Sequence, residues 1–274
     1  MNLELICNQV IDLTQQTGEF LLSNSQNFDV SKIEYKGVNN LVSFVDKQAE
    51  IQLVEGLNRI LPEAGFITEE GTSSIGEKEL NWIIDPLDGT TNYLHGLPHY
   101  SISIALVAKR EVILGVILDP SRKECFYATK ESPAYLNGKK IKASSALKMA
   151  DGLIATGLPY IEFKQMQAYL EILTDFMKNT HGVRRFGSAA IDLAWVACGR
   201  FEGYFEYNLH PWDVAAGVII VKQAGGIISD FAGEDDFIFG KRIIAASANV
   251  HEEMLGVIKK YWKEGEGTLT KGLK

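Results

Sequence analysis

Apolar positions recur every three or four residues over residues 3–22, a spacing typical of an amphipathic helix. The positions on this face are Leu3, Ile6, Val10, Leu13, Thr17, Phe20 and Leu21. A second pattern of the same kind covers residues 43–61 and ends at Pro62, because proline cannot continue a helix. We therefore expect the chain to begin with two helices.

Short apolar runs then predict buried strands at residues 66–68 and 82–84. Each run is followed by an acid, Glu69 after the first and Asp85 after the second. The alternating segment 101–104 and the β-rich runs 111–118 and 125–128 predict an antiparallel meander, and Asn137-Gly138 predicts a tight hairpin turn. The first half of the chain should therefore combine two helices with a sheet.

The second half alternates short strand patterns with helical ones. A strand is expected at residues 153–155, helices at about 162–177 and 250–262, and a loosely held tail at 264–274. No internal repeat or linker divides the 274 residues. We therefore predict a mixed α/β (α+β) fold in a single domain over residues 1–274, with halves at about 1–145 and 146–274.

Composition and charge narrow the class of protein. Hydrophobic residues make up 46% and charged residues 23%, which allows a large core. The net charge is −8 and no run of Lys or Arg stands out, which argues against an extended nucleic-acid interface. The sequence shows neither a signal-like N-terminus nor a run of about 18 apolar residues, so we expect a cytoplasmic protein without a membrane span.

The residues that commonly bind zinc do not form a zinc motif. The three cysteines are widely spaced and are expected to be reduced core thiols. They are Cys7, Cys125 and Cys198. Three histidines, which match no zinc spacing either, are expected to be structural. They are His95, His99 and His210. Trp195 and Trp212 are expected to pack in the core.

The densest chemical signal follows the strand at 82–84 and reads Asp85-Pro-Leu-Asp-Gly-Thr-Thr-Asn-Tyr93. Ligand sites commonly lie at strand ends in α/β sheets, and the proline after Asp85 favours a turn that returns Asp88 to the same side. Gly89 and Thr90 would then open a short helix whose free backbone N–H groups can face a phosphate. Taken alone, Asp-Pro-Leu-Asp-Gly could equally be a surface turn with a capping aspartate.

Two further acidic segments accompany this motif. Pro211 suits the first turn of a helix, so Asp213 would lie at its positive end, where it could also simply complement the helix dipole. Glu69-Glu70 follows the strand at 66–68, although adjacent acids are also common on solvated surfaces. Because clustered carboxylates repel one another, convergence of these acids would favour bound metal ions.

The three segments resemble the inositol monophosphatase family of lithium-sensitive, magnesium-dependent phosphatases, and the resemblance extends over nearly the whole chain. The family pattern Asp-Pro-(Ile/Leu)-Asp-Gly-Thr-x-Asn-(Phe/Tyr) is met by residues 85–93, and residues 212–226 and 69–70 meet the other two patterns. The segment from Lys36 to Ser43 resembles the mobile lysine loop of the family. The resemblance implies a layered α-β-α-β-α sandwich of the sugar phosphatase type and a homodimer.

The resemblance also implies a set of Mg²⁺ ligands, with two or three ions at each site. Glu69, Asp85 and the backbone carbonyl of Leu87 would hold the first ion, and Asp85, Asp88 and Asp213 the second. A third, weaker ion would bind at Glu69. Attack on a phosphomonoester is slow because water is a weak nucleophile and charge accumulates on the leaving oxygen, and two hard cations about 4 Å apart address both problems.

The same resemblance assigns the remaining catalytic residues. Thr90, paired with Asp46, would orient the attacking water next to the catalytic ligand Glu69. The amides of Gly89 and Thr90 would hold the phosphate, together with Asp88. Most metal ligands would thus come from the first half of the chain.

Substrate contacts are expected in the second half. The resemblance places Gly187, Ser188 and Ala189 at the start of a helix that contacts the substrate, and Glu206 where it accepts hydrogen bonds from a polyol. Gly-Ser-Ala could instead be an ordinary helix cap, and Glu206 a solvated acid at a strand end.

We therefore predict a phosphoric monoester hydrolase that converts myo-inositol monophosphate to inositol and phosphate. Fructose-1,6-bisphosphatase, histidinol-phosphate phosphatase and NADP phosphatase are alternatives with the same chemistry. A 3′-phosphoadenosine phosphatase is disfavoured because Thr91-Asn92-Tyr93 stands where those enzymes usually have Lys-Glu-Phe. Some bacterial relatives associate with RNA and the transcription machinery, so a binding protein is the alternative of a different class.

Overall fold

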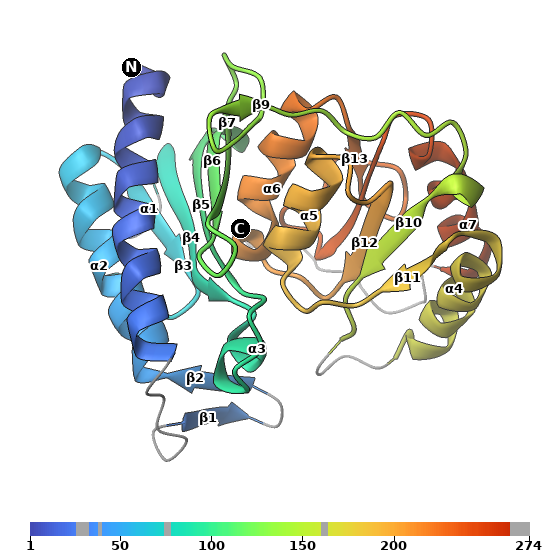
Figure 1. Ribbon diagram of the computed structural model, residues 1–274, viewed down its shortest axis with the longest axis horizontal. Helices are drawn as coiled ribbons and strands as arrows, with labels where there is room; N and C mark the ends of the chain where they lie inside the picture. Colours follow the sequence, from blue (N-terminus) through green and yellow to red (C-terminus); the bar gives the residue numbers. More distant parts are fainter. Residues whose placement is uncertain (26–32, 38–39, 74–77, 160–163, 264–274) are drawn as a thin grey trace, which may run out of the picture.

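The computed structural model describes residues 1–25, 33–37, 40–73, 78–159 and 164–263, with backbone only for 33–37 and 40–43. Helices and sheets alternate in layers across the molecule (Figure 1). The layers are, in order, α1 with α2, a seven-stranded sheet, α5 with α6, a five-stranded sheet, and α4 with α7. The predicted layered α-β-α-β-α sandwich is therefore confirmed.

Two helices, α1 (Leu3–Ser25) and α2 (Phe44–Ile60), cover the outer face of the first sheet. Its strands are β3 (Gly65–Thr68), β4 (Leu80–Asp88), β5 (Ser101–Ala108), β6 (Glu111–Asp119), β7 (Glu124–Thr129), β8 (Tyr135–Leu136) and β9 (Lys139–Lys140). They follow one another in sequence order across the sheet, and all neighbours except β3 and β4 are antiparallel. The predicted meander and the Asn-Gly hairpin turn are both confirmed.

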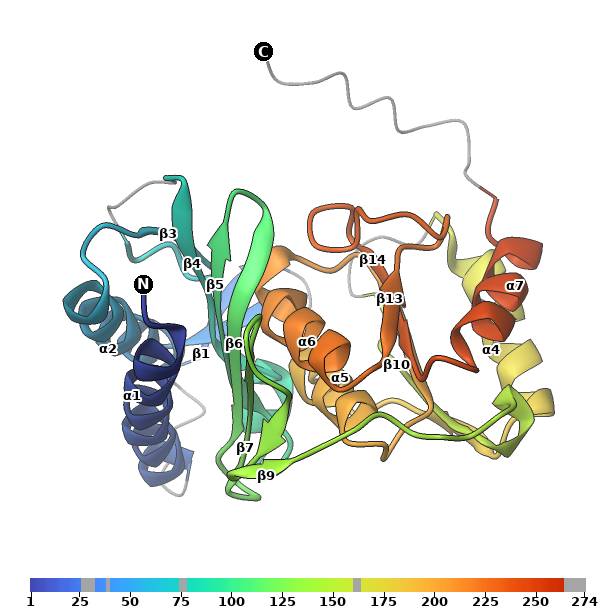
Figure 2. The same ribbon diagram turned by 90° about the horizontal axis from the view of Figure 1, so that it is seen from above.

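The middle layer consists of α5 (Ala189–Ala197) and α6 (Pro211–Gln223), which lie between the two sheets (Figure 2). Both helices are almost entirely apolar because both of their faces are buried. Gly115 on β6 allows α6 to pack closely, since an added Cβ would lie 2.6 Å from the Ala216 carbonyl oxygen. This contact places the start of α6 beside the first sheet.

The second sheet has the order β11 (Gly182–Arg184), β10 (Leu153–Thr156), β12 (Gly203–Tyr207), β14 (Arg242–Ala246) and β13 (Ile227–Ser229). Strand β10 is parallel to both β11 and β12, whereas β14 is antiparallel to its neighbours. Helices α4 (Met166–Asn179) and α7 (His251–Tyr261) cover the outer face. A short 3-10 helix, η2 (Met149–Asp151), precedes β10.

Some elements differ from the expectations. Strand β4 continues past Asp85 to Asp88, because the chain shifts register and pairs again with β5 at Ser101. The segment expected as a lysine loop contains two paired strands, β1 (Ile33–Gly37) and β2 (Asn40–Ser43), while the side chain of Lys36 lies outside the described residues. The expected loose tail, 264–274, also lies outside them. All three cysteines are free thiols, and no helix in the described ranges is long and apolar enough to cross a membrane.

Candidate active site

The Asp-Pro-Leu-Asp-Gly motif forms the end of β4 and the turn into α3 (Thr90–Leu94). Asp85 is buried, and its Oδ1 accepts a hydrogen bond from the backbone N–H of Leu87 at 2.9 Å. Gly89 has φ 97°, and an added Cβ would lie 3.1 Å from the carbonyl oxygens of both Gly187 and His99. Only glycine fits this turn, so the backbone at Gly89 closely approaches the start of α5.

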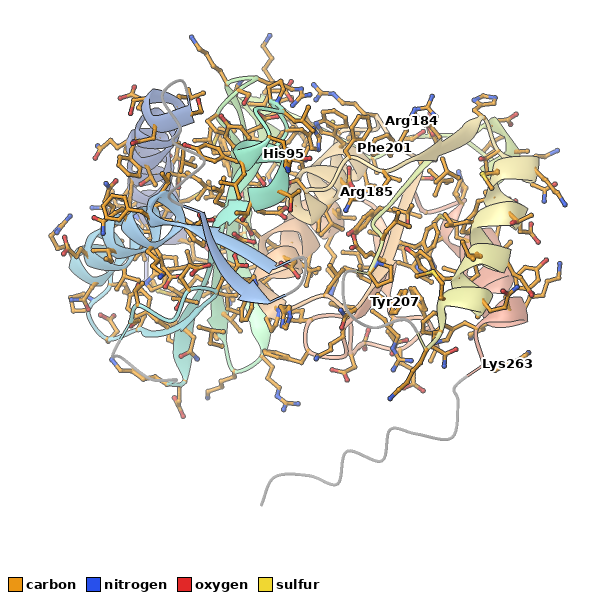
Figure 3. The ribbon with its side chains drawn as sticks, turned by 90° about the horizontal axis from the view of Figure 1, so that it is seen from below. His95, Arg184, Arg185, Phe201, Tyr207 and Lys263 are labelled. Carbon is orange, nitrogen blue, oxygen red and sulfur yellow. The ribbon has the colours of Figure 1, made fainter. Side chains whose placement is uncertain are left out.

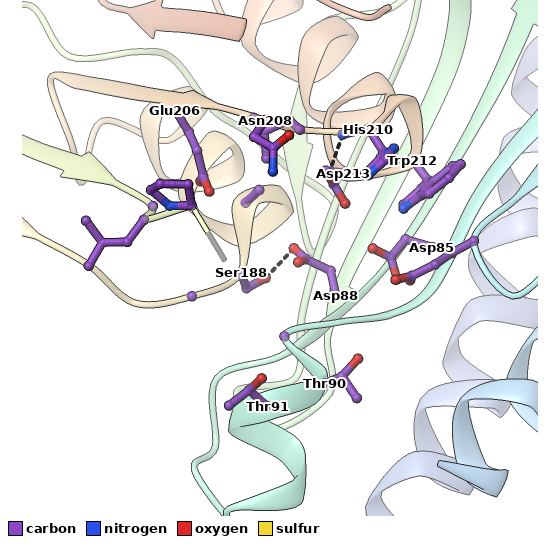
Figure 4. A pocket seen from close by; sticks show the side chains of 18 of the residues that line it. Asp85, Asp88, Thr90, Thr91, Ser188, Glu206, Asn208, His210, Trp212 and Asp213 are labelled. Carbon is purple, nitrogen blue, oxygen red and sulfur yellow. Dashed lines mark hydrogen bonds between the residues drawn. The ribbon is translucent and has the colours of Figure 1, made fainter. Parts of the chain in front are cut away.

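A cavity of about 430 Å³ lies where this turn faces the second half of the chain. It brings together Glu69 after β3, Asp85 and Asp88 from β4, Asp213 from α6 and Glu206 from β12. Figure 4 labels the last four of these acids. Segments up to 144 positions apart in sequence, 69 and 213, therefore contribute acids to one pocket. The surface-turn interpretation of the first motif is wrong, because its acids face this cavity.

The carboxylates in the pocket raise one another's pKa values. Burial raises the pKa of Glu69 to about 8, and the neighbouring acids Glu70, Asp46 and Asp88 add to this. Burial and the charges of Glu69, Asp88 and Asp213 raise the pKa of Asp85 well above its usual range. The carboxyl groups of Glu69 and Asp85 also lie within hydrogen-bonding reach of each other. Such a group of acids is costly to ionise without a compensating positive charge.

The acids are nevertheless not arranged as a ready-made metal cluster. Within the described ranges, no group of three His, Cys, Asp or Glu side chains is placed to hold one ion. Several of them instead make hydrogen bonds with the protein, for example Asp85 with the Leu87 N–H.

Asp88 joins the two halves of the chain at this pocket. Its Oδ2 accepts hydrogen bonds from the hydroxyl of Ser188 at 2.6 Å and from the backbone N–H of Ala190 at 2.7 Å. Ser188 also accepts a hydrogen bond from the N–H of Ile191, so it is the N-cap of α5. Burial raises the pKa of Asp88 to about 6, although these hydrogen bonds act in the opposite direction. The helix-cap interpretation of Ser188 is thus confirmed, while Gly187 and Ala189 line the pocket beside it.

Asp213 lies in the first turn of α6, directly after Pro211 and Trp212. Its Oδ2 accepts a hydrogen bond from the backbone N–H of His210 at 2.6 Å, which closes a capping box. Burial and the charges of Asp88 and Glu69 raise the pKa of Asp213 well above its usual range. Asp213 thus both caps its helix and faces the other acids.

A hydrogen bond joins Thr90, at the start of α3, to Asp46 in the first turn of α2. The hydroxyl of Thr90 lies 3.1 Å from Asp46 Oδ1 and 3.0 Å from the carbonyl oxygen of Leu87. Asp46 is only 2% exposed, and the charge of its buried carboxylate contributes to the raised pKa of Glu69. The pairing proposed from the sequence is therefore present in the structure.

Glu206 is not a freely solvated acid at a strand end. Its Oε2 accepts a hydrogen bond from the hydroxyl of Tyr204 at 2.5 Å, and it lines the same pocket as Asp88. Burial raises the pKa of Glu206 to about 7, and the charge of Asp88 contributes. The carboxylate is thus held inside the cavity, on the side formed by the second sheet.

Trp212 and the histidines differ in part from the expectations. Trp212 contacts the core but also lines the pocket, where its ring stacks on His210 at a centroid distance of 4.7 Å. His99 is buried between Phe186 and Trp195, and burial lowers its pKa to about 4. His99 is therefore structural as predicted, whereas His210 belongs to the pocket wall.

Sequence reasoning did not assign three residues that build the site. Arg185, which follows β11, is the one lysine or arginine among the described residues that line the pocket, and it lies in the middle of the molecule (Figure 3). Asn208, which follows β12, also lines the pocket and has φ 66°. The buried Glu50 of α2 accepts hydrogen bonds from the N–H groups of Glu70 and Thr72, each at 2.8 Å. The position of Glu50 on the apolar face of its helix was the available signal.

The fold and the site together define the class of protein: a layered α/β protein with an acidic pocket between its two halves. The chain belongs to the inositol monophosphatase family, whose model matches residues 2–265. It is 37% identical over 249 residues to the Nus factor SuhB of Escherichia coli, covering 90% of this chain and 93% of the relative.

Solved structures show the same relationship. The extragenic suppressor protein suhB from Bartonella henselae has a TM-score of 0.87 and 37% identity, with 92% of this chain and 98% of that chain covered. The IMPase of Thermotoga maritima has a TM-score of 0.83 and 35% identity, with 92% of this chain and 95% of that chain covered.

Proposed function

We propose that this protein is a Mg²⁺-dependent phosphatase that hydrolyses a small phosphomonoester, myo-inositol monophosphate, to inositol and phosphate. The observation that carries the proposal is the convergence of Glu69, Asp85, Asp88 and Asp213 on one pocket. Membership of the inositol monophosphatase family supports the same reaction class.

The residues in the pocket fit Mg²⁺. This ion prefers oxygen ligands, and the pocket offers five carboxylates, that of Glu206 included, and the carbonyl of Leu87. The raised pKa values of Glu69 and Asp85 show that burial and mutual repulsion oppose ionisation, which a divalent cation would relieve. When bound, Mg²⁺ would promote ionisation of water and neutralise charge on the leaving alkoxide.

We assign the ligands as the resemblance implies. Glu69, Asp85 and the Leu87 carbonyl would hold one ion, Asp85, Asp88 and Asp213 a second, and Glu69 would contribute to a weaker third. Asp88 accepts the hydrogen bonds of Ser188 and Ala190 on Oδ2, so its other oxygen, Oδ1, could bind the ion while these bonds remain.

The hydroxyl of Thr90 is placed to orient the attacking water. When Thr90 donates its proton to Asp46 Oδ1, a lone pair of Oγ1 remains free to accept a hydrogen bond from water. The buried Asp46 carboxylate thus fixes the direction of the hydroxyl group. The backbone N–H groups of Gly89 and Thr90, at the start of α3, would hold the phosphate oxygens.

The alcohol portion of the substrate would lie toward the second half of the chain. Glu206, Ala189 and Gly187 line that side of the pocket, together with Arg185. An ionised carboxylate can accept hydrogen bonds but cannot donate them, so Glu206 suits an alcohol that carries further hydroxyl groups. This favours a polyol phosphate.

Lys36, in β1, is assigned to the mobile lysine loop of the family as the resemblance implies. Its side chain lies outside the described residues.

Family membership supports a proposal for the oligomeric state and the domain organisation. We propose that residues 1–274 form one domain and that two copies associate as a homodimer in the cytoplasm. Light scattering should then give twice the chain mass of 30.4 kDa. A monomer mass at micromolar concentration would contradict the dimer.

The substrate is tested by a panel of phosphate esters assayed for phosphate release with Mg²⁺. The panel comprises inositol 1-phosphate, fructose 1,6-bisphosphate, histidinol phosphate and NADP. The proposal expects the highest kcat/KM for inositol 1-phosphate. A higher value for another ester would keep the reaction class and replace the substrate.

A second candidate function is a binding role in transcription, which the relatives named Nus factor SuhB favour. The net charge of −8 favours a protein partner over naked RNA. Association of purified protein with transcription complexes can be compared between wild type and Asp85→Asn. Association that persists in the variant, together with no phosphate release by wild type from any ester, would favour this candidate.

A further inference from the structure

Strands β10 and β12 bring Gly157 beside Glu206. The two strands are parallel, with Thr156 opposite Phe205, so the next residues along each strand are neighbours. The hydroxyl of Thr156 donates a hydrogen bond to the carbonyl oxygen of Phe205 at 2.8 Å, which fixes this register at the strand ends. Gly157 and Glu206 both line the pocket.

Gly157 has no backbone reason to be glycine. Its φ is not in the left-handed region that favours glycine. A Cβ at this position would instead overlap with the carboxyl group of Glu206, whose Cδ and two oxygens are its nearest neighbours. The Glu206 carboxylate therefore occupies the space that a side chain at position 157 would fill.

Hydrogen bonds hold both sides of this contact. The hydroxyl of the fully buried Tyr169 donates a hydrogen bond to the carbonyl oxygen of Gly157 at 2.7 Å, so the backbone there is anchored to α4. On the other side, the hydroxyl of the fully buried Tyr204 donates to Glu206 Oε2 at 2.5 Å. Tyr204 and Glu206 are two residues apart on β12, so their side chains point to the same face.

We propose that Gly157 and Tyr204 are positioning residues, which hold the Glu206 carboxylate in place to accept a hydrogen bond from a hydroxyl of the substrate's alcohol portion. Together they set a preference for polyol phosphates over esters without further hydroxyl groups. The inference rests on the proposed phosphatase function for its effect on specificity, but the positioning itself is a property of the fold.

The test compares inositol 1-phosphate with p-nitrophenyl phosphate, whose alcohol portion carries no further hydroxyl. Loss of a hydrogen bond to a charged acceptor corresponds to a decrease of about 10-fold to 100-fold in kcat/KM. We expect Gly157→Ala and Tyr204→Phe to lower kcat/KM for inositol 1-phosphate by up to this factor, mainly through KM. The kcat/KM for p-nitrophenyl phosphate should change by less than about 3-fold, because this ester has no hydroxyl that could bind Glu206. Equal losses for both esters would overturn the proposal.

The double variant Gly157→Ala/Glu206→Ala distinguishes positioning from a general structural effect. If Gly157 acts only through Glu206, the double variant should discriminate between the esters as Glu206→Ala does, without a further loss. Additive losses would overturn the proposal. Matched controls are Gly256→Ala, where an added Cβ has open space, and Tyr261→Phe, which removes a remote hydroxyl that donates to Asp175.

Crystal structures of Gly157→Ala and Tyr204→Phe give a readout that needs no turnover. We expect the Glu206 carboxylate to leave its present place in Gly157→Ala and to rotate or become disordered in Tyr204→Phe. An unchanged carboxylate in both variants would overturn the proposal. If wild type hydrolyses neither ester, the proposed function and the specificity role fail together, while the crystal structures still decide whether the two residues position Glu206.

Discussion

Asp88 and Ser188 are 100 residues apart in sequence and are joined by a hydrogen bond of 2.6 Å between Ser188 Oγ and Asp88 Oδ2. The same hydroxyl caps α5 by accepting a hydrogen bond from the N–H of Ile191. One buried hydroxyl therefore links the Asp-Pro-Leu-Asp-Gly motif of the first half to the start of α5 in the second half.

Ser188→Ala should destabilise the protein by about 1–3 kcal/mol, because it removes a helix cap and a hydrogen bond to a carboxylate. Urea unfolding measures this change in the free energy of unfolding. Ser23→Ala, which removes an exposed hydroxyl bonded to the Phe20 carbonyl, is the matched control and should change stability by less than about 0.5 kcal/mol. Equal effects of the two substitutions would contradict the linking role of Ser188.

Glu50→Ala should weaken Mg²⁺ binding although Glu50 is not a proposed ligand. Its carboxylate holds the loop after β3 by accepting hydrogen bonds from the N–H groups of Glu70 and Thr72 and from the Thr72 hydroxyl. Loss of such a supporting group typically costs about 10-fold to 100-fold in metal affinity. Calorimetric titration with Mg²⁺ measures this loss. Glu55→Ala, an exposed acid on the same helix, should leave the affinity unchanged, and an equal loss there would indicate a nonspecific charge effect.

Thr90→Val should lower kcat by about 100-fold to 10,000-fold, because the hydroxyl that orients water is lost while the side-chain volume is kept. Thr90→Ser keeps a hydroxyl that can still donate to Asp46 and should retain most of the activity. Steady-state kinetics on inositol 1-phosphate give both values. Similar kcat values for Thr90→Val and wild type would remove Thr90 from the mechanism.

Stability without divalent ions should fall as the pH rises. Mainly because of burial, folding raises the pKa of Glu69 from 4.5 to about 8, of Glu206 from 4.5 to about 7 and of Asp88 from 3.8 to about 6. Each carboxyl group therefore binds its proton more tightly in the folded chain, and this contribution is complete below the unfolded pKa values and lost as the pH rises through the folded ones.

Urea midpoints measured in EDTA should accordingly decrease between pH 5 and pH 8. Mg²⁺ favours the ionised carboxylates, so a saturating concentration should remove most of the decrease, with a gain of about 2.7 kcal/mol at 100 times the dissociation constant. A midpoint that is constant over this pH range in EDTA, or that is insensitive to Mg²⁺, would contradict the acidic site.

Much of the fold could be predicted from local patterns. The periodicity at residues 3–22 reflects the burial of one face of α1. The β-rich runs at 111–118 and 125–128 reflect the burial of strands β6 and β7 within the layers. The expected strand end at Asp85 was wrong, because pairing of Asp88 with Ser101 depends on a register shift that no local pattern encodes.

The site was predictable where a motif is continuous in sequence and not where it depends on tertiary pairing. Residues 85–93 identified the turn at Gly89, whereas the place of Gly157 beside Glu206 depends on strands that are about fifty residues apart. Arg185 carries no motif of its own, and its place in the pocket follows from the position of β11 at the sheet edge.

The central claim is that the acids of this pocket bind Mg²⁺ for hydrolysis, and phosphate release from inositol 1-phosphate by wild type and Asp85→Asn tests it most directly. Wild type should release phosphate with Mg²⁺ and not with EDTA, while Asp85→Asn, shown to be folded by urea unfolding, should lose at least about 100-fold in kcat. Equal turnover of wild type in Mg²⁺ and in EDTA, or full activity of Asp85→Asn, would contradict the account.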